Sequence, residues 1–288
     1  MSTVLISGGT GLIGRALTEK LLQRGYEVTI LTRNAKQKNI PKFSEKVTFA
    51  EWDTDRKIID ATAIENADYI VHLAGAGIAD KRWTPKRKKE IVDSRVKSSQ
   101  LIVESLEKYP NKIKKIISSS AIGWYGSVAS GVPEGKGSVR NPFVELDPSA
   151  DDFLGETCKQ WEESILPVAE LGKKLVILRT GVVLNPKGGA LKEFLRPIKF
   201  GIAAILGSGE QIVSWIDIDD LVNMYIVSIE NENIQGIYNA VAPQPVTNKE
   251  LVIQLAKSRK SFFIPFRIPS FLLKTLFGEL SIEVLKSS

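Results

Sequence analysis

The sequence is poor in the residues from which disulfides and most transition-metal sites are built. Its 288 residues include one cysteine, Cys158, and one histidine, His72. One cysteine excludes an intramolecular disulfide and a cysteine-rich metal site, and one histidine excludes a histidine pair or a histidine-rich metal site. We therefore expect no metal and a reducing compartment. Because the first strand begins within a few residues of the N-terminus, with no charged and then apolar leader, we expect a cytoplasmic protein.

Long apolar runs and concentrated charge are also scarce. No stretch reaches the roughly 20 apolar residues of a membrane span. The nearest, residues 261–285, contains two prolines and several charged residues, which favours a helix folded back on its own domain over attachment to a membrane surface. The net charge is +6, but only residues 81–89 form a dense basic run, so a solvated helix face explains the charge better than nucleic-acid binding. We expect a small-molecule substrate, no nucleic-acid partner, no membrane, and a monomer or homodimer.

The most informative stretch that is present covers residues 4–15, where an apolar run leads into spaced glycines and then into a helical pattern. A tight turn after a buried strand requires a positive φ at Gly8, the backbone must approach a pyrophosphate at Gly11, and Gly14 lets the helix pack closely. A Walker-type loop is set aside, because Arg15-Ala16 leaves neither its lysine nor its hydroxyl. The candidate cofactor-binding residues are Gly8, Gly9, Thr10, Gly11, Leu12, Ile13 and Gly14.

The residue that ends the second strand distinguishes the two nicotinamide cofactors. An acidic residue there would accept from a ribose 2′-hydroxyl and repel a 2′-phosphate, whereas Arg33 offers a phosphate a charge-assisted partner. The alternative is a surface arginine. We expect NADP(H), with Lys36, Lys38 and Arg15 as further cations near by. Asp53 follows the third strand, where it could lie beside the adenine amino group, and Leu73, Ala74 and Gly75 form a second small-residue loop against the cofactor.

Strand-like and helix-like periods alternate through the first two thirds of the chain, which is 43% hydrophobic and 25% charged as a globular protein should be. Strands are expected near 2–7, 27–32, 47–51, 69–74, 113–119 and 174–179, and helices near 12–24, 57–66, 84–108 and 151–171. This alternation predicts an α/β fold, a Rossmann-like doubly wound parallel sheet. Thr84 and Pro85 suit a helix start, and Pro167 predicts a kink or an early end.

Beyond Thr180 the pattern loosens into glycine-rich turns. We expect a strand at 211–216, a helix at 219–230 with Asp219 as its N-cap, a strand near 237–241, and helices at 247–257 and 269–278. The chain therefore divides into an NADP-binding Rossmann-like core, residues 1–180, and a small C-terminal substrate lobe, residues 181–288, which returns elements to the core and is not an independent domain. Ligands of open α/β sheets bind beyond the carboxyl ends of the strands, where such a lobe would lie.

Residues 8–14, 72–75, 118–126 and 178–181 resemble the extended short-chain dehydrogenase/reductases. Residues 77–85, 93–95, 120–126 and 214–221 resemble more narrowly an atypical branch of nucleoside-diphosphate-sugar epimerase-like proteins, and the likeness runs from residue 2 to about 285. The resemblance implies a Rossmann-like core with NADP(H), which Ser118 would help to bind. It also implies an NADP(H)-dependent oxidoreductase or sugar-nucleotide-epimerase-like enzyme, acting on a hydroxyl or carbonyl carbon of an unassigned substrate.

In that superfamily a serine at the end of the fifth strand works with a later Tyr-x-x-x-Lys pair, in which the phenol moves the proton and the lysine lowers its pKa. Ser120 matches the serine, with Ser119 as its rival. The pair does not match, because Leu154 stands where the tyrosine belongs and Cys158 where the lysine belongs. Another acid could act, the reaction could need little acid–base help, or the protein could be a non-catalytic NADP(H)-binding sensor or regulatory protein.

The residues that could replace the pair are Tyr125, Lys159, Cys158, Asp93 and Arg95. Tyr125 is the phenol closest in sequence to Ser120 and is a candidate catalytic residue, although it could simply pack as an aromatic. Arg95 could clamp an anionic substrate, or form a salt bridge with Asp93 or Asp80.

Three further side chains have an ordinary and a functional interpretation. Cys158 has no histidine or group of cations to form its thiolate, so a nucleophilic role is disfavoured. His72 lies at an apolar strand end and is expected to be a packed residue rather than a catalytic base. Trp215 could stack on a flat or sugar-like substrate group, or be a buried aromatic.

Overall fold

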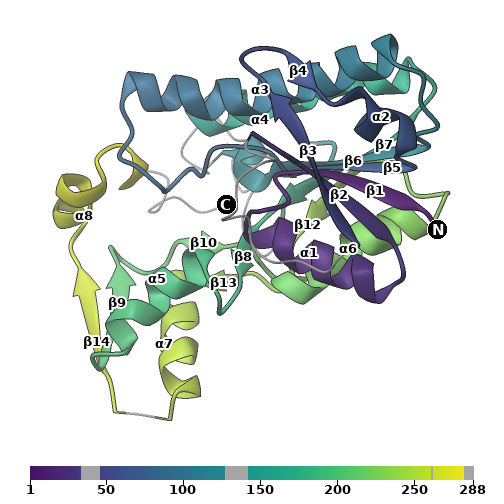
Figure 1. Ribbon diagram of the computed structural model, residues 1–288. Coiled ribbons are helices and arrows are strands. Elements are labelled where there is room, and N and C mark those ends of the chain that lie inside the picture. The colour runs from purple at the N-terminus through teal and green to yellow at the C-terminus, as the bar shows by residue number, and fades with distance from the viewer. Residues whose placement is uncertain (34–45, 127–141, 261, 282–288) are drawn as a thin grey trace.

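The computed structural model describes residues 1–33, 46–126, 142–260 and 262–281. An eight-stranded sheet lies at the centre, in the order β12-β7-β6-β5-β1-β2-β3-β4 (Figure 1). Its strands are β1 (Thr3–Ser7), β2 (Glu27–Thr32), β3 (Val47–Asp53), β4 (Ile58–Ile59), β5 (Tyr69–His72), β6 (Lys115–Ala121), β7 (Lys174–Thr180) and β12 (Gly236–Ala240). All neighbours pair in parallel except β3 and β4. The predicted Rossmann-like parallel sheet is confirmed, and its order reverses between β1 and β5.

Helices cover both faces of this sheet (Figure 1). On one face are α1 (Leu12–Gln23) and α6 (Ile218–Glu230), and on the other are α2 (Ala61–Asn66), α3 (Pro85–Lys108) and α4 (Phe153–Ile165). Each face of the sheet has its own hydrophobic core. Within β1, Val4 and Ile6 pack in the core beneath α1 and α6, whereas Leu5 packs in the core beneath α2, α3 and α4. Burial on both faces explains why the strands are continuous apolar runs rather than alternating ones.

Several helix ends agree with their predicted signals. Thr84 caps α3 by accepting a hydrogen bond from the backbone N–H of Arg87, and Pro85 occupies the first helical position. The early end expected at Pro167 is confirmed, because α4 stops at Ile165 and a 3₁₀ turn, η2 (Leu166–Ala169), follows.

Two helix starts were predicted wrongly. The helix expected from residue 57 begins only at Ala61, because residues 58 and 59 form β4 and Asp60 is the N-cap. Asp219 is not the N-cap of α6: its N–H donates to the carboxylate of Asp217, which holds that position.

Beyond β7 the chain builds a smaller group of elements below the carboxyl ends of the sheet (Figure 1). They are β8 (Val182–Leu184), α5 (Gly189–Ile198), β9 (Ile202–Leu206), β10 (Ile212–Val213), β11 (Trp215–Asp217), β13 (Val246–Thr247), α7 (Asn248–Ser258), β14 (Ile264–Ile268) and α8 (Ser270–Phe277). The strands pair two by two, β8 with β11, β9 with β14 and β10 with β13. Buried side chains of α5, β9 and α7 form a separate small core: Ile198, Ala203, Val252 and Ala256.

Between these pieces, α6 and β12 return to the central sheet. Leu221 and Tyr225 of α6 and Ala240 of β12 are fully buried in the core that α1 shares. In the described part of the chain, no helix combines the length and the apolarity that crossing a bilayer demands.

Candidate cofactor and active site

The turn between β1 and α1 has the conformation that its glycines predict. Gly8 has φ 73°, which confirms the expected left-handed backbone, and the N–H of Gly11 donates to its carbonyl at 3.0 Å. A methyl group on Gly14 would lie 2.5 Å from the Gly8 carbonyl oxygen and 2.5 Å from Gly9 Cα. Helix α1 can therefore lie against the turn only if residue 14 has no side chain.

Some of the other predicted cofactor residues of this loop pack against the protein itself, and others face the neighbouring cleft. A methyl on Gly9 would lie 2.8 Å from Ile30, and Ile13 packs against the core that α1 and α6 share. Leu12 reaches across to Gly188 and Gly189. Thr10 lines the neighbouring cleft together with Gly8 and Gly11.

Helix α1 begins at Leu12, directly after this turn. In the described structure no side chain caps its N-terminus, and its first turn contains no acidic residue. The first N–H groups of a helix have no acceptor within the helix, and the helix dipole places partial positive charge there. This end of α1 is suited to bind phosphate oxygens.

A cleft of about 700 Å³ extends from the glycine turn. Arg33, which follows β2, forms part of its lining, and Leu73, Ala74 and Gly75, which follow β5, form another part. Arg33 is exposed and has no ion pair with any described residue. Lys36 and Lys38 lie outside the described residues. Arg15 donates through Nε to the Thr10 carbonyl at 2.7 Å and lines a second hollow, on the α6 side of α1.

Asp53 is occupied within its own turn. Its carboxylate accepts from the backbone N–H groups of Asp55 and Arg56, and from Arg56 Nε at 2.8 Å. These bonds to Arg56 hold the pKa of Asp53 below its usual value. Its neighbours Trp52 and Thr54 line the cleft, whereas Asp53 itself is not among the lining residues. A contact between Asp53 and adenine stays a prediction.

His72 is a packed residue, as expected. Nδ1 lies 2.6 Å from Ser7 Oγ, and Nε2 lies 3.1 Å from Ser99 Oγ and 3.3 Å from Ser98 Oγ. Burial, reinforced by the positive charge of Arg95, lowers the pKa of His72 to about 3. The imidazole therefore stays neutral at physiological pH.

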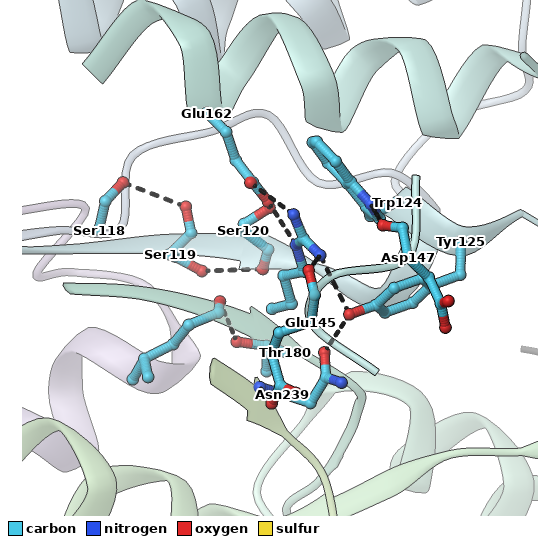
Figure 2. A network of polar contacts seen from close by, with 12 residues as sticks. Ser118, Ser119, Ser120, Trp124, Tyr125, Glu145, Asp147, Glu162, Thr180 and Asn239 are labelled. Atoms are coloured by element: carbon cyan, nitrogen blue, oxygen red, sulfur yellow. Dashed lines mark hydrogen bonds and ion pairs between the residues drawn. The ribbon is translucent and has the colours of Figure 1, made fainter. Parts of the chain in front are cut away.

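Ser120 is part of a buried polar network at the end of β6 (Figure 2). Its hydroxyl donates to Glu162 Oε1 at 2.6 Å, and both Glu162 oxygens accept from Arg179, through Nε and Nη2 at 2.9 Å each. The Arg179 and Glu162 side chains are only 1% and 5% exposed. A paired, bidentate geometry is what allows two such charges to be buried.

The same network holds Tyr125. Its hydroxyl donates to Asn239 Oδ1 at 2.6 Å and accepts from Arg179 Nη1 at 3.1 Å (Figure 2). Its ring also stacks on Phe143. Burial raises the pKa of Tyr125, although Arg179 opposes the shift. The phenol is 3% exposed, so these contacts favour its packing role, and its catalytic role stays a prediction.

The other two serines of the run point along the backbone. Ser118 Oγ donates to the Ser119 carbonyl at 3.2 Å, and Ser119 Oγ donates to the Ser120 carbonyl at 3.4 Å. Like Ser120, neither is among the residues that line the cleft described above. Cofactor contact by Ser118 and catalysis by Ser119 stay predictions.

Leu154 and Cys158 of α4 lie behind the turn that follows β6. A methyl on Gly123 would lie 3.2 Å from Leu154 Cβ and 3.6 Å from Cys158 Sγ. Burial raises the pKa of the Cys158 thiol to about 12, so it is neutral and a poor nucleophile. The positions at which the resemblance places a tyrosine and a lysine thus hold an apolar and a neutral side chain.

The two candidate substrate residues differ in setting. Trp215 is half-buried, and its indole N–H donates to the Gln244 carbonyl at 3.1 Å, so stacking on a substrate stays a prediction. Arg95 is buried in α3, and Nη1 donates to the Ala76 and Ile91 carbonyls. The alternative of a salt bridge from Arg95 was wrong, because Asp93 pairs with Lys89 and Lys97, and Asp80 pairs with Arg87.

Sequence reasoning missed Glu162, Arg179 and Asn239 as members of this site. A charged residue within a buried apolar strand requires a buried partner, so Arg179 was a signal that could have been used. Its partners are Glu162 of α4, the Tyr125 hydroxyl and the Glu145 carbonyl, and they could not be assigned from the sequence.

Comparisons with known proteins agree with this geometry. The model of the NAD dependent epimerase/dehydratase family matches residues 4–240. Epimerase family protein SH2119 of Staphylococcus haemolyticus is 34% identical over 99% of this chain and 89% of the relative. The chloroplastic epimerase family protein SDR39U1 homolog of Arabidopsis thaliana is also 34% identical, over 99% of this chain and 78% of the relative.

Among solved structures, human epimerase family protein SDR39U1 (isoform 2) with NADPH has a TM-score of 0.82 and 30% identity, with 99% of this chain and 90% of that chain covered. UDP-glucose 4-epimerase of Thermus thermophilus in complex with NAD has a TM-score of 0.72, covering 93% and 86%, and at 20% identity it shows the fold alone. By fold and by sequence, this chain belongs to the NAD-dependent epimerase/dehydratase family.

Proposed function

We propose that the protein binds NADP(H) in the cleft and acts as an oxidoreductase or a sugar-nucleotide-epimerase-like enzyme on a hydroxyl or carbonyl carbon. The observation that carries the proposal is that the glycine turn and Arg33 both line the same cleft. The human relative solved with NADPH, similar over 99% of this chain, supports it.

The residues present fit a dinucleotide phosphate. The turn at Gly8 and Gly11 and the uncapped start of α1 would hold the pyrophosphate. Arg33 would hold the 2′-phosphate, and the ribose would lie between them, against Leu73 and Gly75. Such a cofactor, when bound, exchanges hydride at its nicotinamide carbon, and the protein supplies binding and orientation.

Ser120 is the residue that we place beside the reacting oxygen. Because its own proton is donated to Glu162, its oxygen remains an acceptor and would hold the hydroxyl form of a substrate in a fixed direction. Leu154 and Cys158 supply no proton at their positions. The contribution of this chain is therefore mainly orientation, which can itself lower a barrier by several kcal/mol.

A second candidate is a sensor that binds NADP(H) without turnover. It is favoured by the neutral pair Leu154 and Cys158, since the thiol has a pKa of about 12 and cannot replace a lysine cation. A sensor would keep the cleft and Arg33 but would not need a proton donor.

Calorimetry of the purified protein with NADPH and with NADH tests the proposal. We expect NADPH to bind at least roughly tenfold more tightly, since hydrogen bonds to a charged group contribute about 1.5–3 kcal/mol. If neither cofactor binds, the proposal is wrong. NADPH oxidation with a panel of aldehydes, ketones and sugar nucleotides then separates an enzyme from a sensor, which would bind NADPH and oxidise none.

A further inference from the structure

Arg95 is a buried cation without a carboxylate partner among the described residues. It is 8% exposed, and its two hydrogen bonds both come from Nη1, to the Ala76 carbonyl at 3.1 Å and to the Ile91 carbonyl at 2.9 Å. Within the described ranges, Nε and Nη2 have no hydrogen-bond partner. Arg179, which is also buried, differs in this respect, because it has both oxygens of Glu162.

The groups around this guanidinium are neutral or positive. The positive charge of Arg95 acts on two neighbouring groups, Cys158 and His72. Both are neutral at physiological pH, because burial sets their pKa values at about 12 and about 3. The ring of Trp161 lies 5.0 Å from Cζ. Arg87 repels it, and burial lowers the pKa of Arg95 itself. A buried charge without a counter-charge is costly to the folded protein, and an anion that arrives from outside would offset that cost.

The guanidinium lies directly behind the wall of the cofactor cleft. A methyl group built on Gly75 would be 3.2 Å from Arg95 Cζ and 3.4 Å from Nη1, and both Gly75 and Ala76 line that cleft. Arg95 Cζ also lies 5.0 Å from the ring of Trp161 on α4, the helix that carries Cys158 at the position where the resemblance places a lysine. Arg95 therefore stands between the loop that follows β5 and the helix face that follows the serine strand.

We propose that Arg95 binds an oxyanion of the substrate, a carboxylate or a phosphate, at the inner end of the cleft. The proposal rests on the proposed function, because it assumes that the cofactor fills the rest of the cleft. The start of α1 and Arg33 already provide for the phosphates of NADP(H). The substrate class is thus an acid that also carries a hydroxyl or carbonyl group, held by the planar, bidentate geometry that arginine offers to such anions.

Thermal unfolding of the NADPH-saturated protein in inorganic phosphate, with chloride at equal ionic strength as reference, tests this inference. We expect phosphate to raise the Tm of the wild-type protein and not that of Arg95→Met. Without added anion, Arg95→Met should melt at or above the wild-type Tm, because it removes an unpaired buried charge. Arg95→Lys should keep part of the phosphate shift.

Arg179→Met is the matched control, since it removes another buried guanidinium, one whose carboxylate partner is present. It should melt well below the wild type. If Arg95→Met also melts well below the wild type and keeps its phosphate shift, Arg95 is structural and the inference is overturned. If Arg95→Met loses NADPH binding and the wild type does not, Arg95 binds the cofactor, and the inference about the substrate is overturned as well. If the wild type itself does not bind NADPH, the proposed function is wrong instead.

Discussion

At the scale of single residues, Arg33 is expected to set the choice between NADPH and NADH. Replacing it by alanine removes charge-assisted hydrogen bonds to the 2′-phosphate and leaves the glycine turn untouched. NADPH affinity should fall by roughly 10–100-fold, while NADH affinity should stay within about twofold. Calorimetry with both cofactors measures this.

Arg24→Ala is the control for Arg33→Ala, because Arg24 pairs with Glu230 at the surface and does not line the cleft. Its affinity for both cofactors should be that of the wild type. An equal loss of NADPH and NADH affinity in Arg33→Ala would contradict a role in phosphate selection.

Replacing one partner of the Glu162–Arg179 ion pair should lower the free energy of unfolding far more than replacing both partners by apolar residues. Glu162→Gln leaves a buried guanidinium without its charge partner, and we expect a loss of about 3–5 kcal/mol in the free energy of unfolding. The double variant Glu162→Leu, Arg179→Met should recover much of that loss. Urea unfolding of Glu162→Leu, Arg179→Met and the double variant measures the coupling, and simple additivity would show that the pair does not act as a unit.

At the scale of elements, the contact between α1 and the glycine turn permits a direct test. Gly14→Ala places a methyl 2.5 Å from the Gly8 carbonyl oxygen, so α1 must shift. We expect a loss of about 1–3 kcal/mol in stability from the overpacking, together with weaker NADPH binding, because the same shift displaces the N–H groups at the helix start.

Gly25→Ala separates these two effects. Gly25 has φ 85° but an added methyl meets nothing within 4 Å, so alanine there is strained without moving α1. This control should lose about 1–2 kcal/mol of stability and bind NADPH as the wild type does. If Gly14→Ala and Gly25→Ala bind NADPH equally, the packing of Gly14 does not support the cofactor site.

Elements that depend on local patterns were predictable, and those that depend on distant pairing were not. The six apolar runs predicted as strands and the glycine turn after β1 are short-range signals, and the structure confirms them as β1, β2, β3, β5, β6 and β7 and as a turn with a positive φ at Gly8. Helix α5 was missed because it starts at a glycine and contains Pro197, which argues against a helix. Strand β14 contains Pro265 and is an edge strand, so its pairing with β9 left no clear alternation to detect.

The polar network was hidden from the sequence for the same reason. Ser120, Arg179 and Asn239 lie in register across β6, β7 and β12, although they are far apart in the chain. Only the strand order brings them side by side. The cofactor turn could be proposed from one contiguous motif, whereas the network required three strands and a helix to be placed first.

At the scale of the whole molecule, His72 should make the stability of the fold depend on pH. In the unfolded chain its pKa is near 6.5, and in the folded protein burial lowers it to about 3. Between these values the unfolded state binds a proton that the folded state cannot accept, so stability falls as the pH drops below 6.5. The loss should reach about 2 kcal/mol at roughly pH 5 and grow until the folded-state pKa is reached.

Carboxylates also contribute to acid unfolding. Because the wild type and His72→Gln have the same carboxylates, that contribution cancels in the difference between their unfolding free energies. Glutamine carries no titrating group, so the difference in unfolding free energy between wild type and variant should change by about 2 kcal/mol between roughly pH 7 and 5, in favour of the variant at low pH. Urea unfolding at several pH values measures this difference. If the two curves stay parallel, the imidazole gains its proton equally in both states, and the buried hydrogen bonds to Ser7 and Ser99 do not keep it neutral in solution.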